Sequence, residues 1–280
     1  MRSPVRAAAL LAALLFVPGL DALAQKKYEP QVGQAGKDVI WVPTPAEVVD
    51  RMLTMAQVTP QDFVVDLGAG DGKIAIAAAK KFGARSMGIE YNPDMAKHAH
   101  ANAQAAGVAG NGQGKTVIKQ GDIFATDFSQ ATVVTMYLLP GLNLKLRPTI
   151  LSMRPGTRVV SHSFTMDDWE ADEISSIDGR HAYFWVVPAN VQGGWNLDAG
   201  GQKLVLNFEQ RYQKINGTVA LGKVQAGLRE PRLRGFNIAF AYVDEKGMRR
   251  DFTGTVSGGK MEGSVRDEKG STARWTATKN

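Results

Sequence analysis

A glycine-rich run in the first third of the chain carries the clearest chemistry. Asp66, Gly68, Gly70 and Gly72 alternate with other residues where a short β-branched run gives way to an alanine-rich stretch. Glycine lets backbone N–H groups approach a ligand closely. The run therefore predicts a ligand-binding turn between a strand and a helix, with an ordinary structural turn as the alternative.

The spacing of these glycines argues against a dinucleotide as the ligand. A dinucleotide-binding turn has the pattern G-x-G-x-x-G or G-x-G-x-x-A. Lys73 stands where its third small residue belongs. We therefore expect the turn to bind a different cofactor, and not NAD.

Two further carboxylates follow the next two expected strands. Glu90 ends the strand expected at residues 86–90, and Asp122 follows the strand at 116–119. A carboxylate in the position of Glu90 can accept hydrogen bonds from both hydroxyls of a ribose. Each acid alone could be a solvated loop residue, but their order along one αβ alternation favours a shared site.

Three more segments belong to the same pattern. Tyr137 ends the expected fourth strand and Pro140 follows it, and Trp41 lies upstream in the run Trp-Val-Pro-Thr-Pro. Residues 158–164 span the end of the expected fifth strand. With the glycine run, these segments resemble class I methyltransferases that use S-adenosylmethionine. They are most similar to the small protein-lysine methyltransferases of mitochondria and their prokaryotic relatives, which modify the c-ring protein of ATP synthase and the adenine nucleotide translocase.

The resemblance covers residues 39–169 and implies a cofactor site. In that family the glycine loop cradles the amino-acid end of the cofactor, and the acid at Asp66 acts directly or through water. Asp122 would accept from the adenine amino group, and Ile123 would pack on the ring. The implied cofactor residues are Asp66, Gly68, Ala69, Gly70, Gly72, Glu90, Asp122 and Ile123.

Methyl transfer from a sulfonium is an in-line displacement, so the protein mainly aligns the nucleophile and excludes water. A lysine acceptor must be neutral, and an apolar, aromatic channel lowers its pKa by desolvation. Tyr137, Pro140 and Trp41 are the candidates for this channel, unless the two aromatic residues are simply core. The alternatives to a protein-lysine substrate are a small-molecule or lipid methyltransferase, or a non-catalytic protein that binds S-adenosylmethionine.

The elements that must position these residues follow from the hydrophobic pattern. Residues 38–190 alternate short apolar runs with helical patterns, which predicts an α/β Rossmann-like sheet with helices on both faces. Strands are expected at 63–67, 86–90, 116–119, 132–137 and 157–161. Thr44, Pro45 and Glu47 predict a capping box, and Asn92 predicts the start of another helix.

Residues 191–280 predict a second, all-β domain. Leu204, Leu206 and Phe208 alternate with Val205, Asn207 and Glu209, and Asn216-Gly217 is typical of a tight hairpin turn. Further turns are expected at 245–247, 257–259 and 268–270. We therefore expect an antiparallel barrel or sandwich.

Charge separates the two domains. The whole chain of 280 residues has a formal charge of +6, and residues 201–280 hold 15 Lys and Arg against 8 Asp and Glu. Arg232 and Arg234 would project from one strand face. That face is either a solvated surface or a docking site for an anionic membrane or an acidic partner, and no motif for nucleic acid is present. The chain has no cysteine and four histidines without metal-ligand spacing, so no metal is expected.

The first residues resemble an export signal. Arg2 and Arg6 precede an apolar run at 7–17, and Ala22 and Ala24 supply small residues for cleavage. The run is shorter than the roughly 20 residues that span a bilayer, which argues against an uncleaved anchor. We expect a signal peptide at 1–24, a linker at 25–37 and a periplasmic or secreted protein. The cofactor is made in the cytoplasm, which keeps the non-catalytic alternative open.

Overall fold

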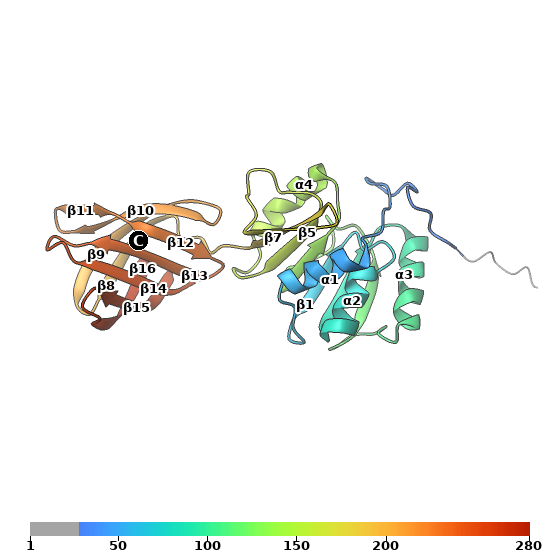
Figure 1. Cartoon of the computed structure of the whole chain (residues 1–280), viewed down its shortest axis with the longest axis horizontal. Coiled ribbons are helices and arrows are strands. Elements are labelled where there is room, and N and C mark those ends of the chain that lie inside the picture. The colour runs from blue at the N-terminus through green and yellow to red at the C-terminus, as the bar shows by residue number, and fades with distance from the viewer. Residues whose placement is uncertain (1–27) are drawn as a thin grey trace, which may run out of the picture.

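The protein is built from two sheets that form separate bodies joined side by side (Figure 1). The computed structural model describes residues 28–280, so the predicted signal peptide at 1–24 lies outside the described residues. The first body holds a seven-stranded sheet with the helices, and the second a nine-stranded antiparallel sheet. None of the helices within residues 28–280 is long and apolar enough to cross a membrane.

The first sheet has the strand order β3-β2-β1-β4-β5-β7-β6. Its parallel part agrees with the predicted strands to within one or two residues at each end. β7 runs antiparallel to both of its neighbours. The strands are β1 (Phe63–Leu67), β2 (Arg85–Glu90), β3 (Thr116–Gln120), β4 (Val133–Met136), β5 (Arg158–His162), β6 (Glu173–Ile177) and β7 (Arg180–Val186).

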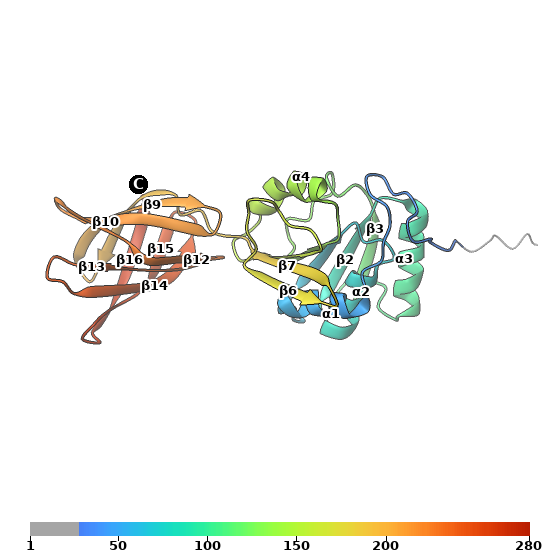
Figure 2. The ribbon, with the colours of Figure 1, turned by 45° about the horizontal axis from the view of Figure 1, so that its top comes forward.

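Helices cover both faces of this sheet (Figure 2). Three lie on one face, α1 (Ala46–Met55), α2 (Lys73–Phe82) and α3 (Pro93–Ala105), and α4 (Pro140–Leu151) lies on the other. Val64 and Val133 pack toward α1 and α2, whereas their neighbours Val65 and Val134 pack toward α4, because successive strand residues point to opposite faces. The Rossmann-like prediction is confirmed.

The two predicted helix starts have different outcomes. Asn92 caps α3 as predicted, since its side chain accepts from the N–H groups of Asp94 and Met95 at 2.9 and 3.0 Å. The capping box at Thr44 is wrong: Pro45 is the N-cap of α1, and no side chain caps it. The Thr44 hydroxyl instead lies 3.1 Å from Nδ1 of His162, so a tertiary contact replaces the local one.

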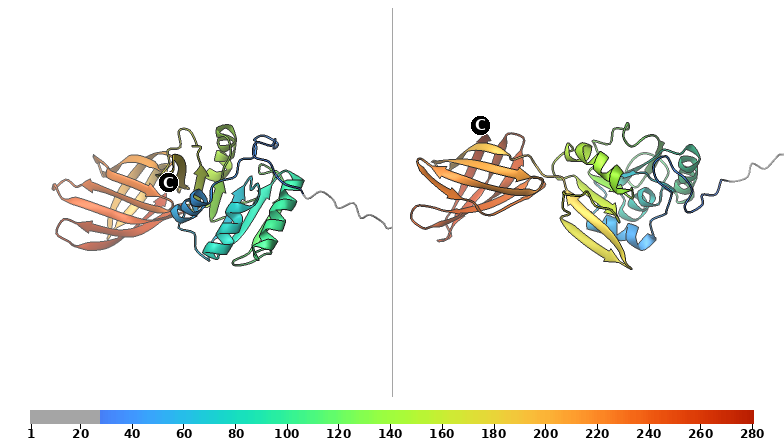
Figure 3. Two further views of the ribbon diagram at one scale, coloured as in Figure 1. Left: turned by 45° about the vertical axis from the view of Figure 1, so that its right-hand side comes forward. Right: turned by 90° about the horizontal axis from the view of Figure 1, so that it is seen from above.

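The second sheet curls into a nearly closed barrel (Figure 3), which answers the choice between barrel and sandwich. Its order is β11-β10-β9-β8-β16-β15-β14-β13-β12, and the edge strand β12 comes back beside β10. The strands are β8 (Gly193–Ala199), β9 (Gln202–Arg211), β10 (Lys214–Leu221), β11 (Val224–Gly227), β12 (Arg229–Arg234), β13 (Asn237–Val243), β14 (Arg249–Ser257), β15 (Lys260–Asp267) and β16 (Thr272–Lys279).

Apolar side chains from the alternating positions fill the barrel. Leu204, Leu206 and Phe208 are buried as predicted, and the three later turns fall where expected. The predicted turn at Asn216-Gly217 is wrong, because both residues lie inside β10. A side chain at Gly217 would place its Cβ 2.2 Å from the carbonyl oxygen of Asn207, so this glycine serves close strand approach. The chain reverses earlier, between β9 and β10.

Candidate functional site

A cavity of about 280 Å³ opens at the carboxyl edge of the parallel strands. This is the edge where α/β sheets bind their ligands. The glycine loop after β1 forms its floor, and the ends of β2 and β4 form its sides. Residues 34–44, which precede α1, complete the lining.

The glycines of the loop allow cavity-lining side chains to pack closely against its backbone. Gly68 and Gly70 line the cavity with φ angles of 75° and 54°, and Ala69 lies between them. A Cβ at Gly70 would lie 2.6 Å from Nε1 of Trp41. Gly72 does not line the cavity. It is the N-cap of α2, where its φ of 82° turns the chain into the helix.

Asp66 lies at the end of β1 with its side chain buried against the cavity. Its Oδ1 accepts a hydrogen bond of 2.7 Å from the Thr135 hydroxyl. Burial is the main reason that the pKa of Asp66 rises to about 7; the charges of Asp71 and Glu90 act in the same direction, and the hydrogen bond from Thr135 acts against them. This carboxyl therefore changes its charge near neutral pH.

Glu90 is held rigidly at the end of β2. Its two carboxylate oxygens accept from the backbone N–H groups of Gly70 and Asn92, each at 2.9 Å. Each oxygen keeps a second lone pair, so the carboxylate can still accept from two hydroxyls of a ligand. This geometry fits the ribose of the cofactor.

Asp122 lies across the cavity, beside Ile123. One oxygen accepts from the N–H of Phe124 at 2.9 Å, and the other from Nζ of Lys37 at 2.7 Å. The hydrogen bond from Lys37 lowers the pKa of Asp122. The Lys37 ammonium also lies 4.6 Å from the centre of the Tyr91 ring. Sequence reasoning missed Lys37, which lies in the predicted linker.

The predicted acceptor channel is only partly assembled by the residues expected. Tyr137 and Trp41 line the cavity, joined by Phe164 from the loop after β5. The rings of Tyr137 and Phe164 are stacked at a centroid distance of 6.1 Å. Pro140 does not line the cavity: it is the exposed first residue of α4, and its fixed φ suits that position.

Behind Tyr137 lies a buried histidine that sequence reasoning did not single out. The His162 ring lies 3.9 Å from the Tyr137 ring, and its Nδ1 pairs with Thr44. Burial lowers the pKa of His162 to about 4, with Arg180 adding to the effect, so the ring is neutral at physiological pH. A histidine at the carboxyl end of the fifth strand was the available signal. No cluster of His, Asp and Glu that could hold a metal occurs within residues 28–280.

Comparison with known proteins agrees with this geometry. The sequence profile of the ANTKMT methyltransferase domain matches residues 66–173. A protein-lysine N-methyltransferase of Saccharolobus islandicus is 44% identical over 53% of this chain and 94% of its own length. The adenine nucleotide translocase lysine N-methyltransferase of Mus musculus is 27% identical over 56% of this chain and 63% of its own length.

A solved structure extends the match to the cofactor. The crystal structure of an RNA methyltransferase from Salinibacter ruber with S-adenosylhomocysteine is 49% identical, has a TM-score of 0.51, and spans 54% of this chain and 96% of that chain. The glycine cradle, the doubly bound Glu90 and the carboxylate of Asp122 fit this cofactor. The chain therefore belongs to the methyltransferase family that includes the Saccharolobus protein-lysine N-methyltransferase, and it is an S-adenosylmethionine-dependent methyltransferase.

Proposed function

We propose that this methyltransferase transfers the methyl group to the ε-amine of a lysine in a protein substrate. The observation that carries the proposal is the aromatic wall of the cavity, made by Trp41, Tyr137 and Phe164. Such rings exclude water, and desolvation lowers the pKa of a lysine amine, so that the amine enters as the neutral nucleophile. The names of the Saccharolobus and mouse relatives support the same acceptor.

For methyl transfer to a lysine, the protein mainly has to position the two reactants. The cofactor supplies a methyl group on a positive sulfur, and the lysine nitrogen forms its new bond to carbon as the carbon–sulfur bond breaks. The nitrogen must first release its proton to solvent, and desolvation in the aromatic channel favours that release. Glu90 and Asp122 would hold the nucleoside of the cofactor in the same cavity whose wall carries Tyr137 and Phe164.

The acceptor class can be tested directly. Purified residues 25–280 are incubated with S-adenosylmethionine labelled in the methyl group and an extract of the source cells, and the label is followed after protease, ribonuclease or organic extraction. We expect protease-sensitive label that mass spectrometry locates on lysine. Tyr137→Ala should lose most of the transfer while binding S-adenosylhomocysteine normally. Label that only ribonuclease or organic solvent removes would overturn the lysine proposal.

We propose further that the outer face of the barrel docks on an anionic membrane surface. Arg232 and Arg274 lie in one cross-strand row through Ala239, Thr253 and Ser264. Four strand spacings of about 4.8 Å separate these two arginines by roughly 19 Å. A layer of lipid headgroups is wide enough to contact both arginines at once. The small side chains of Ala239, Thr253 and Ser264 lie between them and do not block this contact.

The charges of this face support an anionic partner. Arg234 lies beside Arg232 on β12, and all three arginines are exposed. Within residues 28–280, Arg232, Arg234 and Arg274 make no ion pair with a carboxylate. The charges of Arg232 and Arg274 are therefore available to phosphate groups, whereas Arg234 also lies 6.0 Å from the centre of the Phe184 ring and acts on Asp172. Glu262 lies on the same face.

Vesicle sedimentation tests the docking proposal. We expect the chain to bind vesicles rich in phosphatidylglycerol and to release them as salt is raised, because screening shortens the attraction to about 8–10 Å. Arg232→Ser with Arg234→Ser should lose binding, whereas Lys246→Ser with Lys269→Ser, which removes equal charge from two barrel turns, should keep it. Equal binding to neutral vesicles would contradict the proposal. Binding to an immobilised acidic protein but to no vesicle would also contradict it, and would favour the acidic protein as partner.

We also propose that the chain is exported. Support comes from the sequence alone, through Arg2, Arg6, the apolar run at 7–17 and the small residues before Gln25. Mass spectrometry of protein recovered from the cell envelope should find Gln25 at the mature N-terminus. Ala24→Leu should slow cleavage, and an uncleaved chain found only in the cytoplasm would contradict export.

A further inference from the structure

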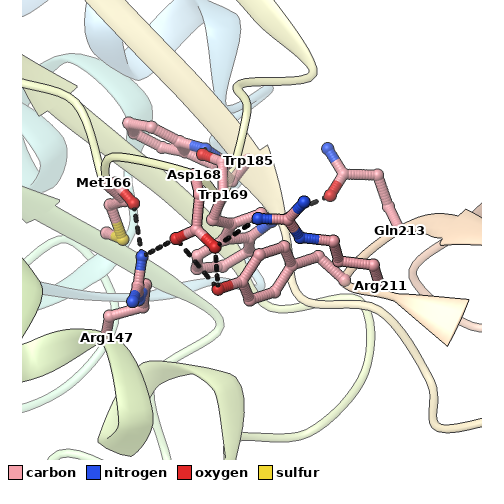
Figure 4. Close-up of polar contacts among 8 residues, drawn as sticks. Arg147, Met166, Asp168, Trp169, Trp185, Arg211 and Gln213 are labelled. Atoms are coloured by element: carbon pink, nitrogen blue, oxygen red, sulfur yellow. Dashed lines mark hydrogen bonds and ion pairs between the residues drawn. The ribbon is translucent and has the colours of Figure 1, made fainter.

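The barrel contacts the methyltransferase domain through the turn between β9 and β10 (Figure 4). The Tyr212 ring stacks on Trp169 at a centroid distance of 6.0 Å. The Gln213 amide oxygen accepts from the Trp169 indole N–H at 3.0 Å, and its amide nitrogen donates to the Glu170 carbonyl at 2.8 Å. One two-residue turn therefore holds a segment that lies more than forty residues earlier in the chain.

Asp168 adds a charged centre to the same contact. Its carboxylate accepts from Arg211 at 2.8 Å and from the Tyr212 hydroxyl at 3.1 Å, both from the barrel side. Arg147 of α4, which belongs to the methyltransferase domain as Asp168 does, also donates to this carboxylate. The hydrogen bond from Arg211 is the main reason that the pKa of Asp168 falls to about 2, so the carboxylate is charged throughout the physiological range.

The segment held in this way is the loop that carries Phe164 into the cavity. We call residues 163–172 the acceptor loop. Ser163 and Asp167 have φ angles of 63° and 57°, a left-handed conformation that side chains other than glycine adopt at a cost. A loop with two such residues needs contacts that fix its path.

Those contacts come from two sides. On the side of the methyltransferase domain, the buried Asn143 amide donates to the Thr165 carbonyl at 3.2 Å, and Arg147 donates to the Met166 carbonyl at 2.8 Å. These bonds contact the half of the loop that is nearest Phe164. The half from Asp168 onward contacts Arg211, Tyr212 and Gln213 of the barrel.

The relatives show that this second support is an addition. About half of the present chain accounts for 94% of the Saccharolobus relative and 96% of the Salinibacter structure. Proteins of that length cannot contain counterparts of both domains. The contact between barrel and loop is therefore a feature of this chain that the shared methyltransferase domain does not require.

We propose that the β9–β10 turn of the barrel positions the acceptor loop, and through it Phe164, in the wall of the methyl-acceptor cavity. Tyr212 and Gln213 are positioning residues, since they reach the cavity only through the loop. The assignment of that wall to the acceptor rests on the proposed function. The positioning itself does not, and it has its own readout.

Hydrogen exchange on the full mature chain tests the positioning. Tyr212→Ala with Gln213→Ala should raise exchange of amides in the acceptor loop by about tenfold or more, because loops exchange by local opening that lost contacts make easier. Exchange in β1 and β4 should stay unchanged. Glu245→Ala with Lys246→Ala, in an exposed turn of the same barrel, is the matched control and should leave the loop protected.

The effect on transfer is measured with the same variants. We expect the KM for the methylated cell fraction to rise about tenfold in the turn variant, with affinity for S-adenosylhomocysteine unchanged, and Tyr212→Phe, which keeps the ring, to restore most of it. Unchanged exchange in the loop would overturn the proposal, and so would faster exchange with normal transfer. If the double variant fails to fold, Arg211→Ser gives the same comparison.

The two hypotheses can fail separately. If the wild-type chain methylates no protein, the lysine proposal fails, but the exchange data still decide whether the barrel holds the loop. If transfer to lysine is found and the turn variant leaves both exchange and KM unchanged, only the positioning proposal fails.

Discussion

The two sheets of this protein bury different kinds of polar side chain. Among residues 28–280, the buried Ser, Thr, Asn, Asp and His side chains lie between Thr44 and His162, in the methyltransferase domain, whereas the barrel buries the Tyr242 hydroxyl. The barrel interior is filled with apolar and aromatic groups, including Trp195, Phe240 and Trp275. Burying a polar group costs free energy unless a partner compensates. Two of these buried groups, Thr44 and Asp66, line the cavity, and every residue that lines this cavity belongs to the methyltransferase domain.

The largest expected effect is a loss of barrel stability when a side chain of the barrel core is removed. Trp275 is fully buried, and its indole N–H donates to the Thr253 and Ser264 carbonyls at 3.0 and 3.1 Å. Trp275→Ala should lower the free energy of unfolding of the barrel by about 3–5 kcal/mol, through the cavity and the lost bonds. Thermal denaturation should show it, with Val205→Ala on the exposed face as control. Loss of S-adenosylhomocysteine binding in the folded variant would contradict the separation of roles.

The next largest effect is expected on cofactor affinity when the glycine loop is changed. Gly70→Ala should lower the affinity for S-adenosylhomocysteine about 100-fold, or about 2.7 kcal/mol, because the new Cβ would lie 2.6 Å from the Trp41 indole nitrogen. Calorimetry measures this. Gly247→Ala, at a barrel turn with φ of 75° and open space around it, should cost barrel stability and leave affinity intact. Equal losses in both variants would show general destabilisation instead.

A smaller effect tests the ribose contact. Glu90→Ala removes a charged acceptor that two backbone N–H groups hold in place, so binding should weaken by about 1.5–3 kcal/mol. Glu90→Gln keeps one acceptor oxygen and should lose less. Calorimetry at fixed pH gives both values, and an unchanged affinity in the alanine variant would remove Glu90 from the cofactor site.

The smallest expected effect is the pH dependence that the buried carboxyl of Asp66 gives to cofactor affinity and to stability. Asp66 keeps its proton up to about pH 7 when folded, against 3.8 ordinarily. A positively charged cofactor favours the ionised form, so S-adenosylmethionine affinity should rise about tenfold between pH 6 and pH 8 and then level off. The same raised pKa means that the unliganded chain loses stability as the pH rises from about 4 to 7. Asp66→Asn should flatten both profiles, and a retained pH dependence would assign it to another group.

Predictions from local patterns held where the cause was local. The strands, the Asn92 cap and the later barrel turns depend on residues within a few positions of one another, and the structure agrees. Predictions failed where a distant partner intervened. Thr44 was expected to cap α1 and instead pairs with His162, 118 residues away. Gly217 was expected in a turn, but the backbone of a neighbouring strand requires a glycine there.

The sequence by itself determined the cofactor half of the site. Asp66 and Glu90 lie at the ends of β1 and β2, and Asp122 follows β3. Parallel strands bring their carboxyl ends to the same edge of the sheet. Only the tertiary structure decided which residues line the proposed acceptor half of the cavity and what supports them. His162 lies against Tyr137 because β5 is the neighbour of β4 in the sheet. Tyr212 of the barrel contacts the acceptor loop, which carries Phe164, through Trp169. Such contacts join side chains far apart in the chain, so no pattern of neighbouring residues encodes them.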